Sequence, residues 1–185
     1  MVFWVAVGGL LVWLSFEFLL RGPGEPRQWM GLADVGQSTR VLLVAFLISL
    51  AVSLLLSGFR IALAPIPIRW AGCILLFVGL GLRAWSMAIL GTRYSRSLQV
   101  MQRQELVTAG PYRLIRHPGY AGSLLVWIGY ALGAGSLAAV ILVSLVLGGA
   151  YLYRITAEER MLRANLGAPY QMYQQRTWRL IPGLF

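Results

Sequence analysis

Long uncharged stretches alternate with short polar ones along this chain. Residues 2–20 are apolar apart from Glu17 near the end, and residues 41–59 form a second uncharged stretch of similar length. A third apolar stretch begins near Arg69, continues to about residue 90 and contains one further charge, Arg83. A helix needs roughly 20 residues to cross the core of a bilayer. The pattern therefore predicts three membrane spans in the first half of the chain.

The second half begins with an uncharged run of 36 residues, 118–153. One helix of that length would measure about 54 Å, well beyond a hydrocarbon core of about 30 Å. The Gly-Ala-Gly-Ser sequence at 133–136 favours two spans joined by a tight turn. The polar tail then predicts a short helix over 158–166 that ends at Gly167, and another over 169–178. The predicted fold is an all-α integral membrane protein with five transmembrane helices.

Two connections between the first spans are marked by proline. Residues 21–40 contain Gly-Pro-Gly-Glu-Pro and predict a solvated loop, and Ala-Pro-Ile-Pro at 64–67 separates two helices. Glu17 lies four residues before Arg21, which is one helical turn. An interfacial ion pair between them is favoured over a buried functional carboxylate.

Composition and charge support the membrane interpretation and give it an orientation. Mean hydropathy is +0.71, only 12% of the residues are charged, and the net charge is +10. Five spans put Arg60 and Arg69 on the side of the N-terminus and the other fourteen arginines on the opposite side. Arginine accumulates on the cytoplasmic side of membrane proteins. We therefore expect the N-terminus outside, with the polar segments 91–117 and 154–185 in the cytoplasm and no nucleic acid as partner.

The segment 110–122 has the strongest chemical character. It contains His117, the only histidine, together with two arginines and two tyrosines. Because Pro118 follows, His117 either caps the next helix or contacts a ligand. One histidine and the lone Cys73 offer no set of metal ligands, so no metal is expected.

A second candidate group follows the last predicted span. Arg154 and Glu158 lie four residues apart and share a helix face. They either form a plain intrahelical ion pair or bind a ligand, the carboxylate taking an ammonium and the arginine a carboxylate. The sequence has no Gly-x-Gly-x-x-Gly after a strand and no Gly-x-x-x-x-Gly-Lys, so a nucleotide cofactor would be bound in another manner.

Five motifs of the second half occur together in an order and spacing that resemble the isoprenylcysteine carboxyl methyltransferase family. They are Leu106-Val107-x-x-Gly110-x-Tyr112, Arg116-His117-Pro118-x-Tyr120-x-Gly122, Arg154-x-x-x-Glu158-Glu159, Gly167-x-x-Tyr170-x-x-Tyr173 and Leu180-Ile181-Pro182. Phospholipid methyltransferases share a looser version. The match covers residues 79–185, and the first two spans carry no specific resemblance. The resemblance implies an integral membrane enzyme that takes S-adenosylmethionine from the cytosol.

The length predicts one membrane domain over 1–185, with two N-terminal spans in 1–68. The resemblance implies that 69–185 forms a methyltransferase core. The cofactor pocket would be built from the 91–120 segment and the C-terminal helices. Its implied residues are Gln99, Gln104, Glu105, Leu106, Val107, Tyr112, His117, Pro118, Gly119, Tyr120 and Glu158.

The implied acceptor is lipophilic, with the carboxylate of an isoprenylcysteine-like substrate favoured. Arg154 would orient that carboxylate and act as the catalytic residue. Arg93 stands where the family tends to carry asparagine, so it is a second candidate contact for an anionic acceptor. Gly79 and Gly81 resemble a glycine pair linked to cofactor binding in the phospholipid branch, although small residues on a membrane helix more often serve close packing.

Other hypotheses remain open. The acceptor could be a phospholipid amine or a hydrophobic thiol, but these need deprotonation, for which Arg154 is poorly suited. Membrane sterol reductases, which use a nicotinamide cofactor, resemble the C-terminal half. The two-glutamate motif and the short chain argue against an oxidoreductase. A membrane scaffold without activity would leave both polar groups unexplained. The expected partners are membrane lipid and a lipophilic small molecule or prenylated acceptor.

Overall fold

The computed structural model describes residues 1–19, 33–91 and 106–183. These residues form α1 (Val2–Leu19), α2 (Ala33–Gly58), α3 (Ile66–Leu90), the 3-10 helix η2 (Gly110–Arg113), α4 (Pro118–Ala134), α5 (Leu137–Leu166) and α6 (Ala168–Arg176). Within these ranges the only β-type pairs are the isolated bridges Leu63–Ser136 and Ile115–Trp178. The prediction of an all-α fold is confirmed for the part of the chain that is described.

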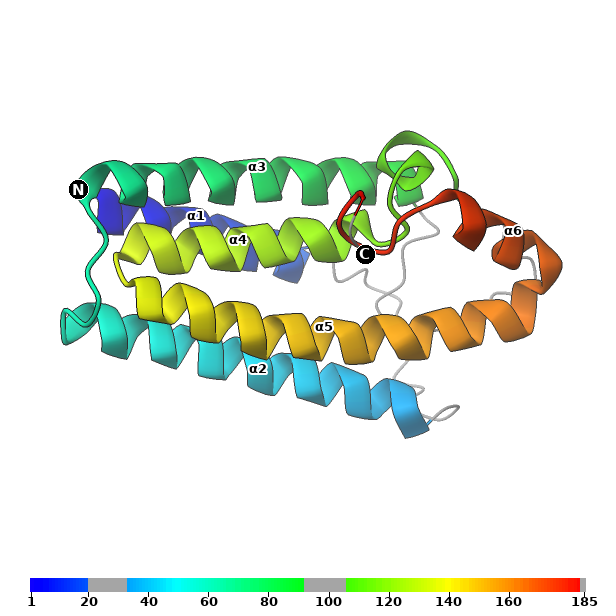
Figure 1. The fold of residues 1–185 in the computed structure, drawn as a ribbon, viewed down its shortest axis with the longest axis horizontal. Coiled ribbons are helices and arrows are strands. Elements are labelled where there is room, and N and C mark those ends of the chain that lie inside the picture. Colours follow the sequence, from blue (N-terminus) through cyan, green and yellow to red (C-terminus); the bar gives the residue numbers. More distant parts are fainter. Residues whose placement is uncertain (20–32, 92–105, 184–185) are drawn as a thin grey trace.

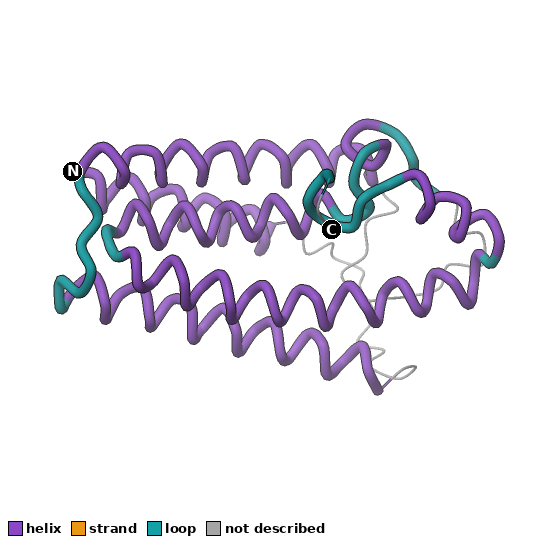
Figure 2. The backbone as a smooth tube through the Cα atoms, viewed as in Figure 1, coloured by secondary structure: helices purple, strands orange, loops and turns teal. Residues whose placement is uncertain are grey.

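Helices α1 to α5 lie side by side along the long axis of the molecule (Figures 1 and 2). α3 packs most extensively on α4, α2 packs on α5, and α1 packs against both α3 and α4. η2 and α6 lie at one end of this bundle, and the α2–α3 connection and the α4–α5 turn lie at the other. The two polar segments of the sequence therefore meet at the same end.

Three helices have the length and composition needed to cross a membrane: α3, α5 and the part of α2 from Gln37 to Gly58. α1 contributes a shorter apolar stretch, Val2–Glu17, and α4 has 17 residues. The five aligned helices correspond to the five predicted spans. That α1 and α4 also cross the membrane stays a prediction.

Two helix boundaries that we predicted from the sequence are wrong. α2 begins at Ala33, so the predicted loop does not extend to residue 40. The early turns of α2 are polar, and the hydroxyls of Ser38 and Thr39 there accept hydrogen bonds from Arg154 on α5, which gives these polar side chains partners inside the bundle. The predicted helix 158–166 is not separate from the last span either. No glycine or proline lies between Gly149 and Gly167, so α5 continues past residue 158 and reaches 30 residues, about 45 Å.

Glycine allows α3 and α4 to approach closely. A methyl group on Gly79 would lie 2.6 Å from the carbonyl oxygen of Gly122, and one on Gly129 would lie 2.5 Å from the backbone nitrogen of Leu76. Helix packing is therefore confirmed as the role of Gly79. Gly81 faces open space, so the packing hypothesis is wrong for that residue.

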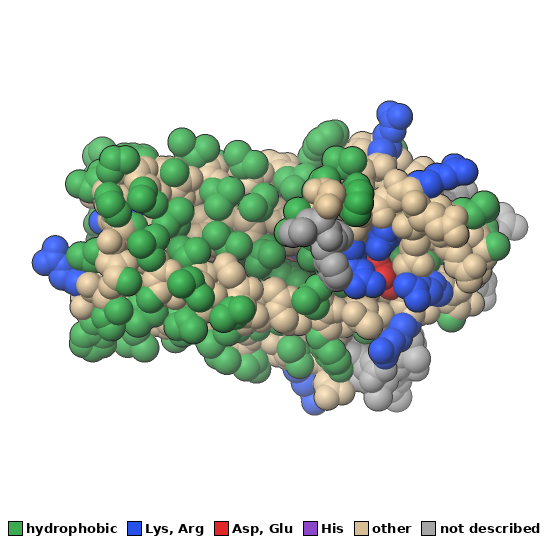
Figure 3. Space-filling model, viewed as in Figure 1, with side chains coloured by type: hydrophobic (Ala, Val, Ile, Leu, Met, Phe, Trp, Pro, Cys, Tyr) green, Lys and Arg blue, Asp and Glu red, His purple; other side chains and the backbone are tan. Residues whose placement is uncertain are grey.

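Aromatic side chains connect the helices in the middle of the bundle. Phe46 of α2 stacks on Trp127 of α4 with ring centroids 5.3 Å apart, and Trp13 of α1 meets both rings edge-on. Large apolar side chains cover much of the visible outer surface (Figure 3). An apolar core inside an apolar exterior is what a bundle surrounded by lipid requires.

Candidate functional site

A buried carboxylate, that of Glu159 on α5, joins three segments of the chain. Its side chain is 2% exposed. Its Oε1 accepts a hydrogen bond of 3.0 Å from Arg116 Nε and lies 3.2 Å from His117 Nε2. Its Oε2 accepts one of 2.9 Å from Arg179 Nη2, and Arg163 Nη2 lies 3.6 Å away. One negative charge is thus held by several cationic groups, which fixes its position.

Arg116 also holds the C-terminal tail in place. Its guanidinium donates to the carbonyl oxygens of Gln174 and Thr177 at the end of α6. Its backbone nitrogen donates to Trp178 O at 2.7 Å, and Trp178 N donates to Leu114 O at 2.9 Å. The tail therefore runs alongside the segment that leads into α4.

A buried tyrosine fastens α6 to η2. The hydroxyl of Tyr173 donates a hydrogen bond of 2.7 Å to the backbone carbonyl of Tyr112. Burial raises the pKa of Tyr173 to about 12, so the hydroxyl keeps its proton at neutral pH and remains a donor. The predicted site residue Tyr112 is thereby fixed through its backbone.

The hydroxyl of Tyr120, one turn into α4, bridges the two charged residues that the sequence singled out on α5. It donates to Glu158 Oε2 at 2.8 Å and accepts from Arg154 Nε at 3.4 Å. Arg154 Nη1 in turn donates to Ser38 Oγ at 2.8 Å and Thr39 Oγ1 at 3.0 Å on α2. Arg154 and Glu158 are thus connected through a tyrosine, and the connection extends to α2.

The two adjacent glutamates have different surroundings. Glu159 is buried within its cationic partners, whereas the side chain of Glu158 is 24% exposed. His117 lies between them, with Nε2 beside Glu159 and Nδ1 4.0 Å from Glu158 Oε2. Its ring also stacks on Tyr120, the centroids 5.7 Å apart. Glu158 is the glutamate that a ligand can reach.

Glu17 has a partner far away in the sequence. Arg83 of α3 lies 2.5 Å from Glu17 Oε1, and its Nη1 donates to the carbonyl of Gly119 at 2.9 Å. The expected partner of Glu17, Arg21, lies outside the described residues. The observed pair ties α1 and α3 to the first turn of α4, where the predicted site begins.

The structure brings together His117, Tyr120, Arg154 and Glu158 from the predicted site. His117 occupies the N-cap position of α4, but its side chain makes no capping hydrogen bond, so the capping hypothesis is wrong. Of the other predicted site residues, Tyr112 and Pro118 are buried, and Leu106, Val107 and Gly119 are partly buried. The predicted residues outside the described ranges are Arg93, Gln99, Gln104 and Glu105.

Sequence reasoning did not assign roles to several residues that build the site. They are Ser38, Thr39, Arg83, Arg116, Glu159 and Arg179. The composition alone could have indicated that Glu159 and Glu17 pair with arginines. The chain has six carboxylates and 16 arginines, so a buried carboxylate can be expected to have an arginine partner.

Comparison with known proteins agrees with the geometry. Residues 67–168, more than half of the chain, match the family model of the phospholipid methyltransferases. A probable protein-S-isoprenylcysteine O-methyltransferase of Oryza sativa subsp. indica is 27% identical over 117 residues, 62% of this chain and 61% of the relative. Methanethiol S-methyltransferase 2 of Bradyrhizobium diazoefficiens is 33% identical over 130 residues, 65% of this chain and 46% of the relative. The chain thus matches less than two thirds of the length of either protein.

A solved structure shares the fold. The eukaryotic intramembrane Ras methyltransferase, an isoprenylcysteine carboxyl methyltransferase, superimposes with a TM-score of 0.71 at 23% identity. The superposition covers 99% of this chain and 67% of that one. The isoprenylcysteine methyltransferase relatives and the shared fold confirm the resemblance expected from the motifs. Because its family model matches residues 67–168, the chain belongs to the phospholipid methyltransferase family.

Proposed function

We propose that the protein is a membrane methyltransferase that uses S-adenosylmethionine and methylates a lipophilic acceptor, with the carboxylate of an isoprenylcysteine-like substrate favoured. The observation that carries this proposal is the difference between the twin glutamates. Glu159 is buried in a structural cluster, and Glu158 is partly exposed beside Tyr120, His117 and Arg154. An accessible carboxylate next to a positioned arginine suits a cationic cofactor and an anionic acceptor.

When bound beside Glu158 and Tyr120, S-adenosylmethionine would supply an activated methyl group to the acceptor oxygen and would leave as its demethylated product, with sulfur keeping the electron pair. Glu158 binds the methionyl ammonium, and the hydroxyl of Tyr120 holds that carboxylate in one orientation. Arg154 orients the acceptor carboxylate, and the hydroxyls of Ser38 and Thr39 fix the arginine from α2. A carboxylate acceptor needs no general base, so these residues act by positioning and by excluding water.

The remaining residues of the proposed pocket are those that the sequence resemblance implies. Arg93, Gln99, Gln104 and Glu105, followed by Leu106 and Val107, complete the cofactor pocket and the contact with an anionic acceptor. This segment joins α3 to η2, and both ends of it lie at the same end of the bundle as Glu158.

We also propose that all five long helices cross the membrane, with the N-terminus outside and the site facing the cytoplasm. Arginines gather around the glutamates at one end of the molecule, as Figure 3 shows. The arginine count of the sequence favours this end as the cytoplasmic one. A soluble cofactor then arrives from the cytoplasm, and a lipid acceptor enters sideways between the helices.

A thiol acceptor is the second candidate, because the Bradyrhizobium relative is named a methanethiol S-methyltransferase. A thiol must lose its proton, and Arg154 cannot accept one. The arginine bound to Ser38, Thr39 and Tyr120 therefore favours the carboxylate. A phospholipid amine meets the same objection.

The test is transfer of a labelled methyl group from S-adenosylmethionine to three acceptors: a prenylcysteine, an alkyl thiol and a total lipid extract. We expect the prenylcysteine to be labelled fastest. Glu158→Gln should weaken cofactor binding at least tenfold, and Arg154→Ala should leave cofactor binding unchanged while raising the acceptor KM or lowering kcat. Purified protein that binds neither S-adenosylmethionine nor its demethylated product would refute the proposal. Loss of cofactor binding in Arg154→Ala would refute the role given to the arginine.

A further inference from the structure

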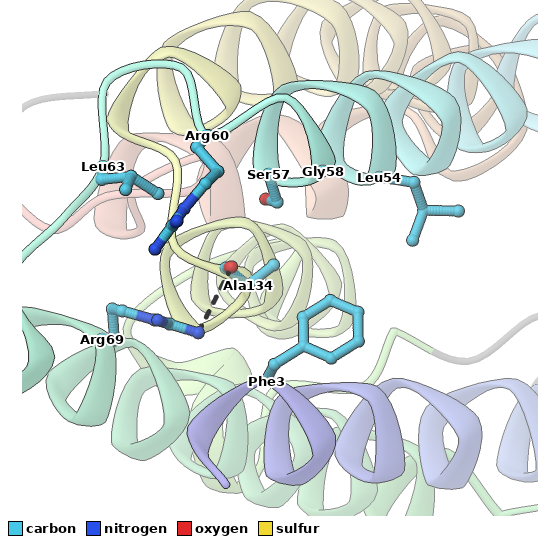
Figure 4. Close-up of a pocket in the computed structure, with 8 residues that line it drawn as sticks. All are labelled: Phe3, Leu54, Ser57, Gly58, Arg60, Leu63, Arg69 and Ala134. Atoms are coloured by element: carbon cyan, nitrogen blue, oxygen red, sulfur yellow. Dashed lines mark hydrogen bonds between the residues drawn. The ribbon is translucent and has the colours of Figure 1, made fainter.

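A pocket lies at the end of the bundle opposite the glutamates, where α1 and α3 begin and α2 and α4 end (Figure 4). Its volume is about 290 Å³, near the lower end of the range for ligand sites, about 300–1,000 Å³. In Figure 4 the side chains of Arg60 and Arg69 lie toward one end of the pocket and those of Phe3 and Leu54 toward the other. The pocket thus has a cationic end and an apolar end.

The described part of the chain provides no carboxylate to balance the cationic end: none of its residues that line the pocket is Asp or Glu. Arg69 Nε and Nη2 donate to the carbonyls of Gly133 and Ala134 at 3.2 and 3.5 Å. An arginine has five N–H donors, so three remain for a ligand. The backbone nitrogen of Arg60 donates to Ser57 O. Its guanidinium makes neither a hydrogen bond nor an ion pair with the described part of the chain, which leaves the whole planar group available.

The backbone holds Arg60 in place despite local strain. Arg60 and Ala62 have φ angles of +58° and +49°, in the left-handed region that non-glycine residues rarely adopt. The connection is fixed to the α4–α5 turn: Leu137 N donates to Ala62 O at 2.9 Å, and Ser136 Oγ donates to Ile61 O at 2.8 Å. Strain of this kind persists where the surroundings determine the conformation, often at ligand clamps. Here it positions a cation at the mouth of a pocket.

The other walls fit an amphiphile. The hydroxyl of Ser57 is buried and has no hydrogen-bond partner among the described residues, so it can serve a polar head group. Leu54 is 45% exposed and borders further apolar side chains on the outside of α2. A chain leaving the pocket over Leu54 and Phe3 would pass directly into the hydrocarbon of the membrane.

We propose that this pocket binds the phosphate of a phospholipid, with an acyl chain leaving between α1 and α2. Arginine binds phosphate through two parallel hydrogen bonds, and Arg60 and Arg69 can each contribute such a pair. The phosphate would place one negative charge between two positive charges that face one pocket, which offsets their mutual repulsion. The occupant is a bound lipid far from the glutamates, so the inference is independent of the acceptor that is methylated.

The test is binding of phosphatidylglycerol to the delipidated protein in dodecyl maltoside, measured by native mass spectrometry. We expect Arg60→Gln to weaken binding at least tenfold, which corresponds to about 1.4 kcal/mol. Arg176→Gln, which removes the same charge from the end of α6, should bind as the parent protein does. Circular dichroism confirms that both variants are folded.

Competing ligands identify which part of the lipid the pocket recognises. Diacylglycerol, which lacks the phosphate, and inorganic phosphate, which lacks the chain, should each fail to displace phosphatidylglycerol. Unchanged phosphatidylglycerol binding by Arg60→Gln overturns the proposal, and so does equal binding of diacylglycerol. Displacement by inorganic phosphate at the lipid's own concentration would show a site for the free ion and overturn it as well. Displacement by a fatty acid but not by a second phospholipid would do the same.

Discussion

The same substitution at the adjacent residues Glu158 and Glu159 should affect two different properties of the protein. Glu159→Gln and Glu158→Gln each remove one negative charge and keep the size of the side chain. Glu159 is buried among Arg116, His117 and Arg179, whereas Glu158 is partly exposed and accepts a hydrogen bond from Tyr120. We expect the first change to affect stability and the second to affect ligand binding.

The expected loss at Glu159 follows from its contacts. A hydrogen bond to a charged group contributes about 1.5–3 kcal/mol, and breaking a buried ion pair costs about 3–5 kcal/mol. Glutamine keeps one oxygen for Arg116 but presents an amide N–H₂ to another donor, Arg179. Because Arg179 and Arg163 are partly exposed, water relieves part of the penalty. We therefore expect Glu159→Gln to lower the free energy of unfolding by about 3 kcal/mol.

At Glu158 the corresponding loss should be small. A glutamine oxygen can still accept the hydrogen bond from the hydroxyl of Tyr120, and the side chain is open to solvent. Substitutions at such positions change stability by less than about 1 kcal/mol. Binding of the methionyl ammonium, however, loses its counter-charge, so cofactor affinity should fall at least tenfold.

Two measurements separate these effects. Intrinsic fluorescence during thermal unfolding in detergent reports stability. Limited trypsin digestion reports release of the C-terminal tail, because the backbone beside its arginines can enter the protease once the Arg116 contacts break. Glu159→Gln should unfold at lower temperature and lose its tail faster. Glu158→Gln should resemble the parent protein in both assays and differ in calorimetric titration with S-adenosylmethionine. Equal stability loss in the two variants, or a stable Glu159→Gln, would refute the division of roles.

Three further changes test other parts of the structure. Gly79→Ala should destabilise the protein by about 1–3 kcal/mol in thermal unfolding, because its methyl group would lie 2.6 Å from a backbone oxygen of α4, and Gly81→Ala, which faces open space, should have no such effect. Tyr120→Phe should leave the protein folded but lower kcat in the methyl-transfer assay, since it removes the hydroxyl that joins the arginine and glutamate of the site. Arg83→Met should cost about 3–5 kcal/mol, because it leaves the carboxylate of Glu17 without this partner; the double variant with Glu17→Gln should recover most of the loss in the same unfolding assay.

Much of the fold could be predicted because its signals are local. Long apolar runs determine which residues are helical, and glycine at a helix end permits the left-handed backbone that stops it. The turn between α4 and α5 falls at Gly135, with φ +110°, and α5 ends at Gly167, with φ +59°. These positions follow from residue type and spacing alone.

Partners that lie far apart in the sequence could not be predicted in the same way. Ser38 and Arg154 are 116 residues apart, and Glu17 and Arg83 are 66 apart. In the sequence, Ser38 sits in a polar stretch typical of a loop, and Glu17 has a nearer arginine one turn away. Only the packing of α2 on α5 and of α1 on α3 decides that these side chains are buried and need partners.

The choice between the twin glutamates depends on packing in the same way. Adjacent helical residues point about 100° apart, so one of Glu158 and Glu159 had to face a different neighbour from the other, but the motif does not say which. Glu159 is the buried glutamate because Arg116, which precedes α4, and Arg179, which follows α6, both donate hydrogen bonds to it. The tail therefore supports the proposed site although it touches no proposed ligand: Arg179 pairs with Glu159, Glu159 contacts His117, and Glu158 remains partly exposed, as the proposed cofactor contact requires. The arginines of two distant segments pair with Glu159 and not with Glu158. This pairing distinguishes the supporting glutamate from the proposed binding one.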